Sequence, residues 1–167
     1  IVKKIINGME DNIRPCVGAT YCLDRIYEGN DALCIHNPAT GREMFMPHEI
    51  SMKANNKKNI IIVGAGPSGL EAAKISSERG HRVVVFEASN IPGGQLNLIT
   101  RSKRRRDMVG IIDWRIKACK TNNVKFYFDT FATKEKILNE NPDVIIIATG
   151  GLPNKDILEE GNELSCS

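Results

Sequence analysis

The sequence predicts an α/β fold, a doubly wound parallel sheet of the FAD/NAD(P)-binding Rossmann type, preceded by an irregular cysteine-containing linker. Two observations predict this fold. From residue 59 onward, short apolar runs alternate with helical segments, which is the pattern of βαβ units. Between the first apolar run and the first helix, residues 64–69 read Gly-Ala-Gly-Pro-Ser-Gly, a sequence typical of a turn that holds a dinucleotide.

The individual elements follow from the same periodicities. Residues 82–87 are nearly all apolar, as expected of a parallel strand covered on both faces, and we expect residues 144–148 to be buried in the same way. Residues 124–128 alternate between apolar and polar, which predicts a half-buried strand. The full prediction is strands at 59–63, 82–87, 124–128 and 144–148, with helices at 68–79 and 107–120.

Length and composition limit the function classes. The 167 residues suffice for about one domain, and 41% hydrophobic with 26% charged residues is ordinary for a globular protein. A net charge of +3 is too small to indicate nucleic acid, and the basic run at 101–106 lacks interleaved aromatic residues. The apolar runs are too short for a membrane span, and no signal segment is recognisable. We therefore expect a cytoplasmic protein that binds neither nucleic acid nor a membrane.

Three regions are expected along the chain. Residues 1–13 begin with apolar residues on one helical face and without an initiator Met, so we interpret them as the end of a preceding domain. Residues 14–57 lose this periodicity and carry three of the five cysteines, which predicts a linker without regular structure. Residues 58–167 are expected to form an incomplete dinucleotide-binding domain.

Each glycine of the turn has a mechanical role. Gly64 permits the tight strand-to-helix turn, Gly66 lets the backbone approach a pyrophosphate, and Gly69 lets the helix pack close to the sheet. The helix N-terminus offers free N–H groups and a positive dipole end to the phosphates. The residues between the glycines complete the predicted turn, namely Ala65, Pro67 and Ser68.

An acidic residue is expected to hold the ribose. Glu87 closes the next strand, 18 residues after Gly69, and its carboxylate can accept hydrogen bonds from both hydroxyls of an adenosine ribose. The same carboxylate would repel a 2′-phosphate, so FAD, ADP or NAD should be preferred over NADP. Later backbone segments are expected to contact the cofactor as well, at Ala88, Gly94, Gln95, Leu96, Ala132, Ala148, Thr149 and Gly150.

These features together resemble a known family. The glycine-rich turn, Glu87, the Gly93-Gly94 segment and the terminal sequence Ala148-Thr149-Gly150 are similar to the FAD half of the two-dinucleotide, disulfide-reductase-like flavoproteins. The resemblance covers residues 59–153. It implies FAD or a bare ADP moiety rather than NAD.

The linker cysteines indicate a possible metal site. Closely spaced cysteines in a chain without secretory signals are typical of metal ligands, and the candidates are Cys16, Cys22, Cys34 and His36. Three alternatives stay open: an iron–sulfur cluster with an incomplete or non-cysteine fourth ligand, a Cys3His zinc site, or no metal. Cys119 is expected in the core, and Cys166 is expected to be free.

The linker also carries a narrower resemblance. Arg14-Pro15-Cys16-Val17-Gly18, Cys22-Leu23-Asp24, and Cys34 with Asn37-Pro38 resemble the cysteine segment of the trimethylamine dehydrogenase and 2,4-dienoyl-CoA reductase family, which is related to old yellow enzyme. Residues 16–29 are most similar to the N-methylproline (stachydrine-type) demethylase subgroup. Cluster-bearing members of the family have a further cysteine three residues after the first, where this chain has Ala19.

This resemblance implies a function. Residues 1–13 would end a missing (β/α)8 barrel that carries FMN and the substrate, and the chain would be the FAD/ADP-binding, electron-transfer portion of a flavin-dependent oxidoreductase. The implied reaction is oxidative demethylation of an N-methylated amine or amino acid, with NAD(H) or another electron acceptor as partner. The alternatives are a 2,4-dienoyl-CoA reductase-like NADH:flavin oxidoreductase and a structural ADP-binding module without a redox role. No catalytic residue is expected within this chain.

Overall fold

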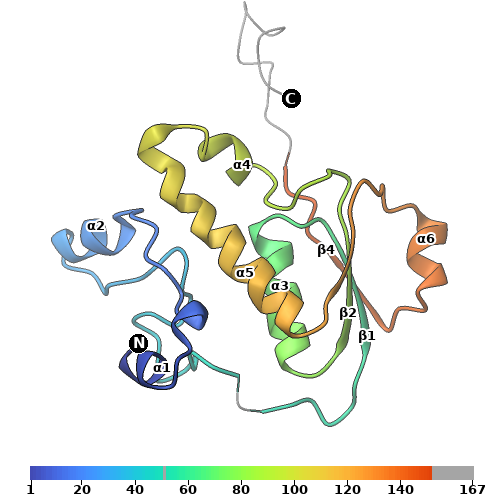
Figure 1. Ribbon diagram of the computed structural model, residues 1–167, viewed down its shortest axis with the longest axis horizontal. Helices are drawn as coiled ribbons and strands as arrows, with labels where there is room; N and C mark the ends of the chain where they lie inside the picture. Colours follow the sequence, from blue (N-terminus) through green and yellow to red (C-terminus); the bar gives the residue numbers. More distant parts are fainter. Residues whose placement is uncertain (51, 152–167) are drawn as a thin grey trace, which may run out of the picture.

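The computed structural model describes residues 1–50 and 52–151. Figure 1 shows a layer of helices packed on a sheet, with the N-terminal segment beside the helices. The elements, in chain order, are α1 (Val2–Ile6), η1 (Glu10–Asn12), α2 (Tyr21–Tyr27), β1 (Asn59–Val63), α3 (Pro67–Glu78), β2 (Arg82–Phe86), α4 (Leu96–Ile99), η2 (Lys103–Val109), α5 (Gly110–Thr121), β3 (Lys125–Tyr127), α6 (Lys134–Asn139) and β4 (Val144–Ile147).

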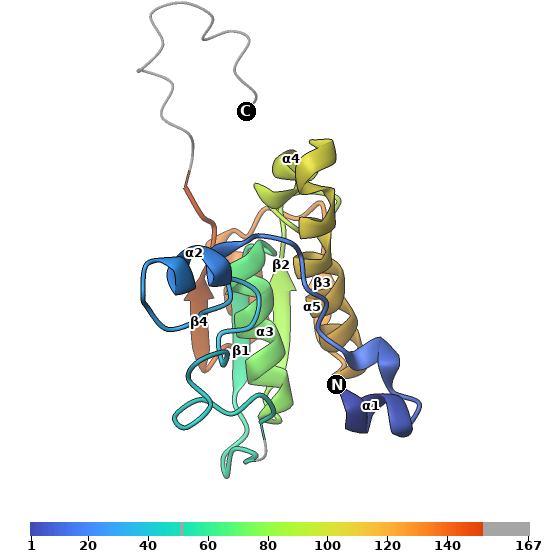
Figure 2. The same ribbon diagram turned by 90° about the vertical axis from the view of Figure 1, so that its left-hand side faces the viewer.

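The sheet confirms the predicted α/β class. Its four strands follow the order β3-β2-β1-β4, and all neighbouring pairs are parallel. In Figure 2 the arrows of β1, β2 and β4 point to the same end of the sheet. At the centre of the sheet Ile61 pairs with Val84 on one side and with Ile145 on the other. Runs of β-branched residues favour these extended strands because their side chains pack well on a pleated surface.

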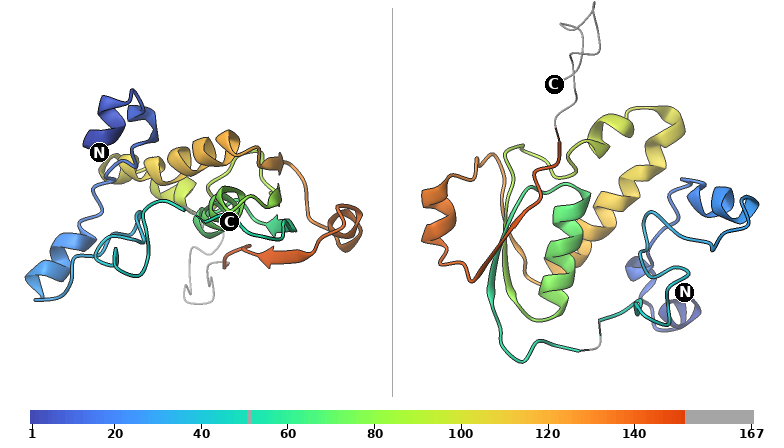
Figure 3. Two further views of the ribbon diagram at one scale, coloured as in Figure 1. Left: turned by 90° about the horizontal axis from the view of Figure 1, so that it is seen from below. Right: turned by 180° about the vertical axis from the view of Figure 1, so that it is seen from behind.

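One face of the sheet is covered by α3 and α5. Seen from below, the two helices lie together on the same side of the strands (Figure 3). Leu70 and Ala73 of α3 and Cys119 of α5 are fully buried there against Ile60, Ile62 and Val85. This is the main core, and it holds the N-terminus of α3 at the carboxyl end of the strands.

A second, smaller cluster lies on the opposite face. Ile61, Val84 and Phe86 are buried there, and Ile137 of α6 packs against them. The ring of Tyr127 stacks on Phe86 with centroids 5.0 Å apart. Apolar side chains therefore lie on both faces of β1 and β2, as the nearly continuous apolar runs of these strands predict.

The last strand differs from its prediction. Residues 144–148 were expected to form a buried strand, but Ile145 and Ile147 are 44% and 67% exposed. β4 lies at the edge of the sheet beyond β1, and in the described residues only one of its faces meets the main core, through Val144 and Ile146. An apolar run alone does not distinguish a central strand from an edge strand.

The helices also differ from prediction in several places. Residues 103–109 form a 3-10 helix and α5 begins only at Gly110, whereas one helix over 107–120 was expected. The linker was expected to lack regular structure, yet it contains α2. The short helices α4 and α6 were not predicted, because single turns carry too few residues for a periodic pattern. In the part of the chain that the structure describes, no helix has both the length and the apolar character that a bilayer crossing requires.

Candidate dinucleotide-binding site

The predicted site lies where the strand order of the sheet reverses. The chain leaves β1 toward β2 on one side, and β4 pairs with β1 on the other. Ligands of open α/β sheets bind at the carboxyl ends of the strands at such a switch point. The strand ends are joined there by two hydrogen bonds, from Gly64 N to Phe86 O and from Ala148 N to Val63 O, both 2.8 Å.

Two glycines of the turn are required by packing. Gly64 has a φ of +103°, and a Cβ at this position would overlap the carbonyl of Ala148. A Cβ on Gly69 would overlap the carbonyl oxygen of Gly64, so the start of α3 lies against the end of β1 as predicted. The turn could not hold this shape with larger residues at either position.

Gly66 has a different environment. It is the N-cap of α3, with an ordinary φ of −72°, and a Cβ built on it meets nothing within 4 Å. Its missing side chain therefore leaves open space directly in front of the helix N-terminus. Pro67 occupies the first helical position, where its missing N–H costs no hydrogen bond, and Ser68 is exposed. This open backbone is the surface that an anionic pyrophosphate can approach.

Glu87 is fixed directly beside the glycine turn. Its Oε2 accepts a hydrogen bond from Ala65 N at 2.6 Å, and its Oε1 accepts one from Ser89 N at 2.9 Å. Its own backbone is held by β3 and the following loop, through Tyr127 O and Thr130 N. A carboxylate offers about four lone-pair sites, so both oxygens can still accept hydrogen bonds from a ribose.

The second glycine segment packs on the first. Gly93 N donates to Ala65 O at 2.9 Å, and a Cβ on Gly94 would lie 3.4 Å from Gly66 Cα. Gly94 has a φ of +53°, a conformation that side chains other than glycine rarely adopt. The structure thus brings residues 64–66, 87 and 93–94 together, although they are far apart in the sequence.

The remaining predicted contacts lie around this centre in different environments. Gln95 Nε2 donates to Gly151 O at 2.7 Å and so ties the Gly94 segment to the end of β4. Leu96 is buried in the main core, which leaves only its backbone for a ligand. Ala132 packs under the smaller cluster. Ala148 packs against the main core, whereas Ala88, Thr149 and Gly150 are exposed.

The predicted metal site is not assembled. Within residues 1–50 and 52–151, no three His, Cys, Asp or Glu side chains group closely enough to hold a metal ion. Cys16 is exposed, and the Sγ of Cys34 accepts hydrogen bonds from the backbone N–H groups of His36 and Asn37. Cys22 lies on α2, and Cys166 lies outside the described residues.

His36 was a candidate ligand in the zinc alternative for the linker. In the structure it is 1% exposed, its Nδ1 lies 3.0 Å from Pro15 O, and its ring packs edge-on against Trp114. Burial, and then the charge of Arg115, lower the pKa of His36 to about 4. Its neutral ring is part of the packing between the linker and α5.

A buried charged cluster beside His36 was not predicted from the sequence. Arg115 Nε lies 2.6 Å from Glu71 Oε2, and both side chains stand at the interface between the helices and the linker. One signal pointed to Arg115: it is four residues from both Ile111 and Cys119, on the buried face of α5. No sequence pattern identifies Glu71 as its partner, because the pair joins two helices.

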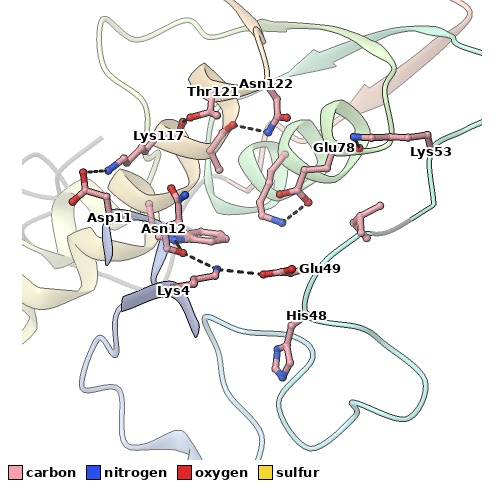
Figure 4. Close-up of a pocket in the computed structure, with 14 residues that line it drawn as sticks. Lys4, Asp11, Asn12, His48, Glu49, Lys53, Glu78, Lys117, Thr121 and Asn122 are labelled. Carbon is pink, nitrogen blue, oxygen red and sulfur yellow. Dashed lines mark hydrogen bonds and ion pairs between the residues drawn. The ribbon is translucent and has the colours of Figure 1, made fainter. Parts of the chain in front are cut away.

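A cavity of about 280 Å³ lies elsewhere, between the N-terminal segment and helices α3 and α5 (Figure 4). Three of its lysines are paired with acids, among them Lys117 with Asp11 at 2.7 Å and Lys74 with Glu78 at 2.8 Å, whereas Lys53 donates to the backbone carbonyl of Glu78. Lys4 and Glu49 form a longer pair of 3.6 Å across the cavity. None of the residues that line this cavity belongs to the glycine turn.

Comparison with known proteins agrees with the geometry of the turn. Residues 62–129 match the family model of the NAD(P)-binding Rossmann-like domain. The whole chain is 58% identical to the probable N-methylproline demethylase of Rhizobium meliloti (strain 1021), of which it covers 24%. Over 95% of its length it is 48% identical to the multifunctional alkene reductase/demethylase OYE of Caballeronia cordobensis, covering 23% of that protein.

A solved structure shows the same arrangement. The 2-naphthoyl-CoA reductase in complex with 2-naphthoyl-CoA superposes with a TM-score of 0.87 at 32% identity, over 96% of this chain and 24% of that one. The chain thus spans about a quarter of the length of the curated relatives that it matches. The similarity includes the linker as well as the Rossmann-like domain.

Proposed function

We propose that this chain, which is similar to flavoprotein demethylases, amine dehydrogenases and reductases related to old yellow enzyme, binds the ADP moiety of FAD, or ADP itself. The observation that carries the proposal is the junction of Gly66 and Glu87 at the switch point of the sheet. An open glycine backbone at a helix N-terminus and a carboxylate one strand away match the two halves of an adenosine diphosphate.

The described residues fit this ligand. The backbone at Gly66 and Ser68, with the N-terminus of α3, would hold the pyrophosphate, because nothing fills the space in front of Gly66. Glu87 would accept the ribose hydroxyls while its bond to Ala65 N keeps it in position. The exposed backbone of Thr149 and Gly150 would run beside the cofactor. When bound, a flavin supplies the redox chemistry, and this chain binds and orients it.

Specificity follows from the charge of Glu87. A 2′-phosphate placed on the same ribose would bring two like charges together, so NADP should bind more weakly than NAD or FAD. The test is a thermal titration of the purified protein with FAD, ADP, NAD and NADP. We expect FAD and ADP to raise the melting temperature, and NADP to raise it least. A melting temperature unchanged by all four would contradict the proposal.

We also propose a reaction for the longer protein of which this chain would be a part. Residues 1–13 would end an FMN-carrying barrel, residues 14–57 would link it to the FAD/ADP-binding domain of residues 58–167, and oxidation of an N-methylated amine or amino acid would occur in the barrel. The probable N-methylproline demethylase supports this choice through its 58% identity. Electrons would leave to NAD(H) or another acceptor. The free thiols of the linker fit a reducing cytoplasm.

A second candidate is a 2,4-dienoyl-CoA reductase-like NADH:flavin oxidoreductase, supported by the likeness to 2-naphthoyl-CoA reductase. The substrate residues that would separate the two reactions lie outside this chain. Turnover assays distinguish the two reactions. They use a natural protein that contains this chain, with N-methylproline as the substrate in one assay and a 2,4-dienoyl-CoA with NADH in the other. The isolated 167-residue chain should bind nucleotide and turn over neither substrate.

A structural ADP-binding module is the remaining alternative. Such a module would release colourless ADP when the protein is denatured, and its absorption would not change on adding dithionite. A flavin spectrum that bleaches with the reductant would favour the redox role.

A further inference from the structure

We propose that residues 14–39, here called the strap, hold neither an iron–sulfur cluster nor a zinc ion, and that a buried polar network fastens the strap to the dinucleotide-binding domain instead. The inference concerns a different part of the chain from the nucleotide site. It rests on the number of donors, on the position of His36, and on contacts that join the strap to α3 and α5.

The cysteines do not supply a cluster. The common [2Fe–2S] and [4Fe–4S] clusters take four cysteine thiolates, and the strap contains only Cys16, Cys22 and Cys34. Cys119 is no substitute, because its Sγ is fully buried between α3 and α5, 3.7 Å from Leu70 O. Burial raises the pKa of the Cys119 thiol to about 12, so it stays protonated.

His36 is in the wrong environment for zinc. Its Nδ1 bonds to Pro15 O, and its Nε2 is buried without a hydrogen-bond partner, but the described residues bring no three His, Cys, Asp or Glu side chains close enough together to hold a metal ion. The guanidinium groups of Arg14 and Arg115 both bond to the backbone carbonyl of His36, at 2.7 and 3.2 Å. Two cations beside the ring would repel a divalent cation at low effective dielectric. His36 is therefore an unfavourable fourth ligand for a Cys3His zinc site.

The strap packs on the domain with apolar residues at the positions between its cysteines. Val17 is buried in the main core and Ala19 packs against the same cluster. α5 begins at a glycine here, and a Cβ on Gly110 would lie 3.2 Å from Pro15 Cγ and 3.4 Å from Val17 Cγ1. The strap and the start of α5 thus lie in close contact because Gly110 lacks a side chain.

The polar network completes the attachment. Glu71 of α3 lies between Arg115 of α5, at 2.6 Å, and Arg14 of the strap, at 3.9 Å. The Arg14 guanidinium also lies 4.1 Å from the centre of the Trp114 ring. A single carboxylate is therefore shared by two cations and joins three segments. This arrangement fixes the two stretches of backbone that carry Cys16 and Cys34 without any metal.

The test is a metal and thiol analysis of the purified protein. The protein is isolated without oxygen and then incubated with ferrous iron and sulfide, or with zinc, before desalting. We expect iron, sulfide and zinc all well below one per chain, no visible absorption from a cluster, and rapid reaction of the exposed Cys16 with a thiol reagent in the native state. Stoichiometric zinc, or iron with sulfide, would overturn the proposal.

A variant provides a readout that does not depend on retained metal. Replacing Cys16, Cys22 and Cys34 together with Ser should leave the melting temperature unchanged within about 2 °C, because a Ser Oγ can accept the two backbone hydrogen bonds that Cys34 accepts. Loss of bound metal with a lower melting temperature would contradict the proposal. The nucleotide titration of the same variant should be unaltered, so failure of the nucleotide site would be seen separately.

Discussion

The carboxylate of Glu87 accepts a 2.6 Å hydrogen bond from the backbone N–H of Ala65, the residue between the first two glycines of the turn. The two residues follow the carboxyl ends of the neighbouring strands β1 and β2 and are separated by 22 positions in the sequence. This bond fixes the acid that we propose for the ribose relative to the backbone that we propose for the phosphates. Such preorganisation lowers the entropic cost of binding.

Gly66→Val tests the phosphate side of the site. The added side chain would occupy the open space in front of α3, so we expect FAD and ADP affinity to fall by on the order of 100-fold, about 2.7 kcal/mol. Calorimetric titration measures these two affinities. The variant should still fold, since its Cβ meets nothing within 4 Å. Gly69→Ala is the contrasting variant: it should destabilise the fold, because its Cβ overlaps Gly64. Unchanged affinity in Gly66→Val would mean that the pyrophosphate lies elsewhere.

Glu87→Gln tests the ribose side. The amide oxygen can still accept from Ala65 N, but the charge is lost, so NAD should bind roughly tenfold more weakly while NADP is less affected. The ratio of NAD to NADP affinity should therefore fall toward one, as measured by thermal shift or calorimetry. A ratio that stays as in the parent protein would exclude Glu87 as the ribose acid.

Glu71→Gln tests the buried network. Removing this charge leaves Arg14 and Arg115 without their shared partner, and we expect unfolding to become easier by about 2–3 kcal/mol. Urea denaturation measures the change, and limited proteolysis should detect release of the strap. Glu49→Gln is the matched control, because its pair with Lys4 is exposed and long. Equal stability of the two variants would contradict the role of Glu71.

His36 should make stability depend on pH. Its pKa is about 4 in the folded protein because burial, and then Arg115, disfavour the imidazolium, whereas the unfolded chain takes up this proton near pH 6.5. The unfolded state therefore binds more protons between these values. Stability is full above about pH 6.5, falls as the pH drops toward 4, and loses up to about 3 kcal/mol from this group.

His36→Gln supplies the comparison for that pH dependence. The variant has no proton to take up at this position, so its stability curve should be flatter between pH 6.5 and 5 than that of the parent protein. The lower part of the range is less informative, because carboxyl groups with lowered pKa values, such as that of Glu140, also lose stabilisation there. Parallel curves above pH 5 would show that His36 does not titrate as stated.

For two strands, the sequence pattern was sufficient to predict the bounds of the element. β1 and β2 were predicted at or within one residue of their bounds, because continuous β-branched runs between turn residues specify a buried strand. The same reasoning placed β4 correctly but misjudged its burial. Whether the second face of a strand is covered depends on its position in the sheet, and strand order is a property of the whole chain rather than of one segment.

The candidate site likewise combines features that its sequence predicts with contacts that depend on how distant segments pack. The glycine turn and the acid that follows it can be recognised from the sequence, because backbone freedom and charge are properties of single residues at short spacing. The sequence does not specify that Glu87 bonds to Ala65, that Gly94 lies against Gly66, or that His36 packs beside a Glu71–Arg115 pair rather than joining the cysteines. These contacts join residues far apart in the chain, and their formation depends on how the helices, the strap and the sheet pack together.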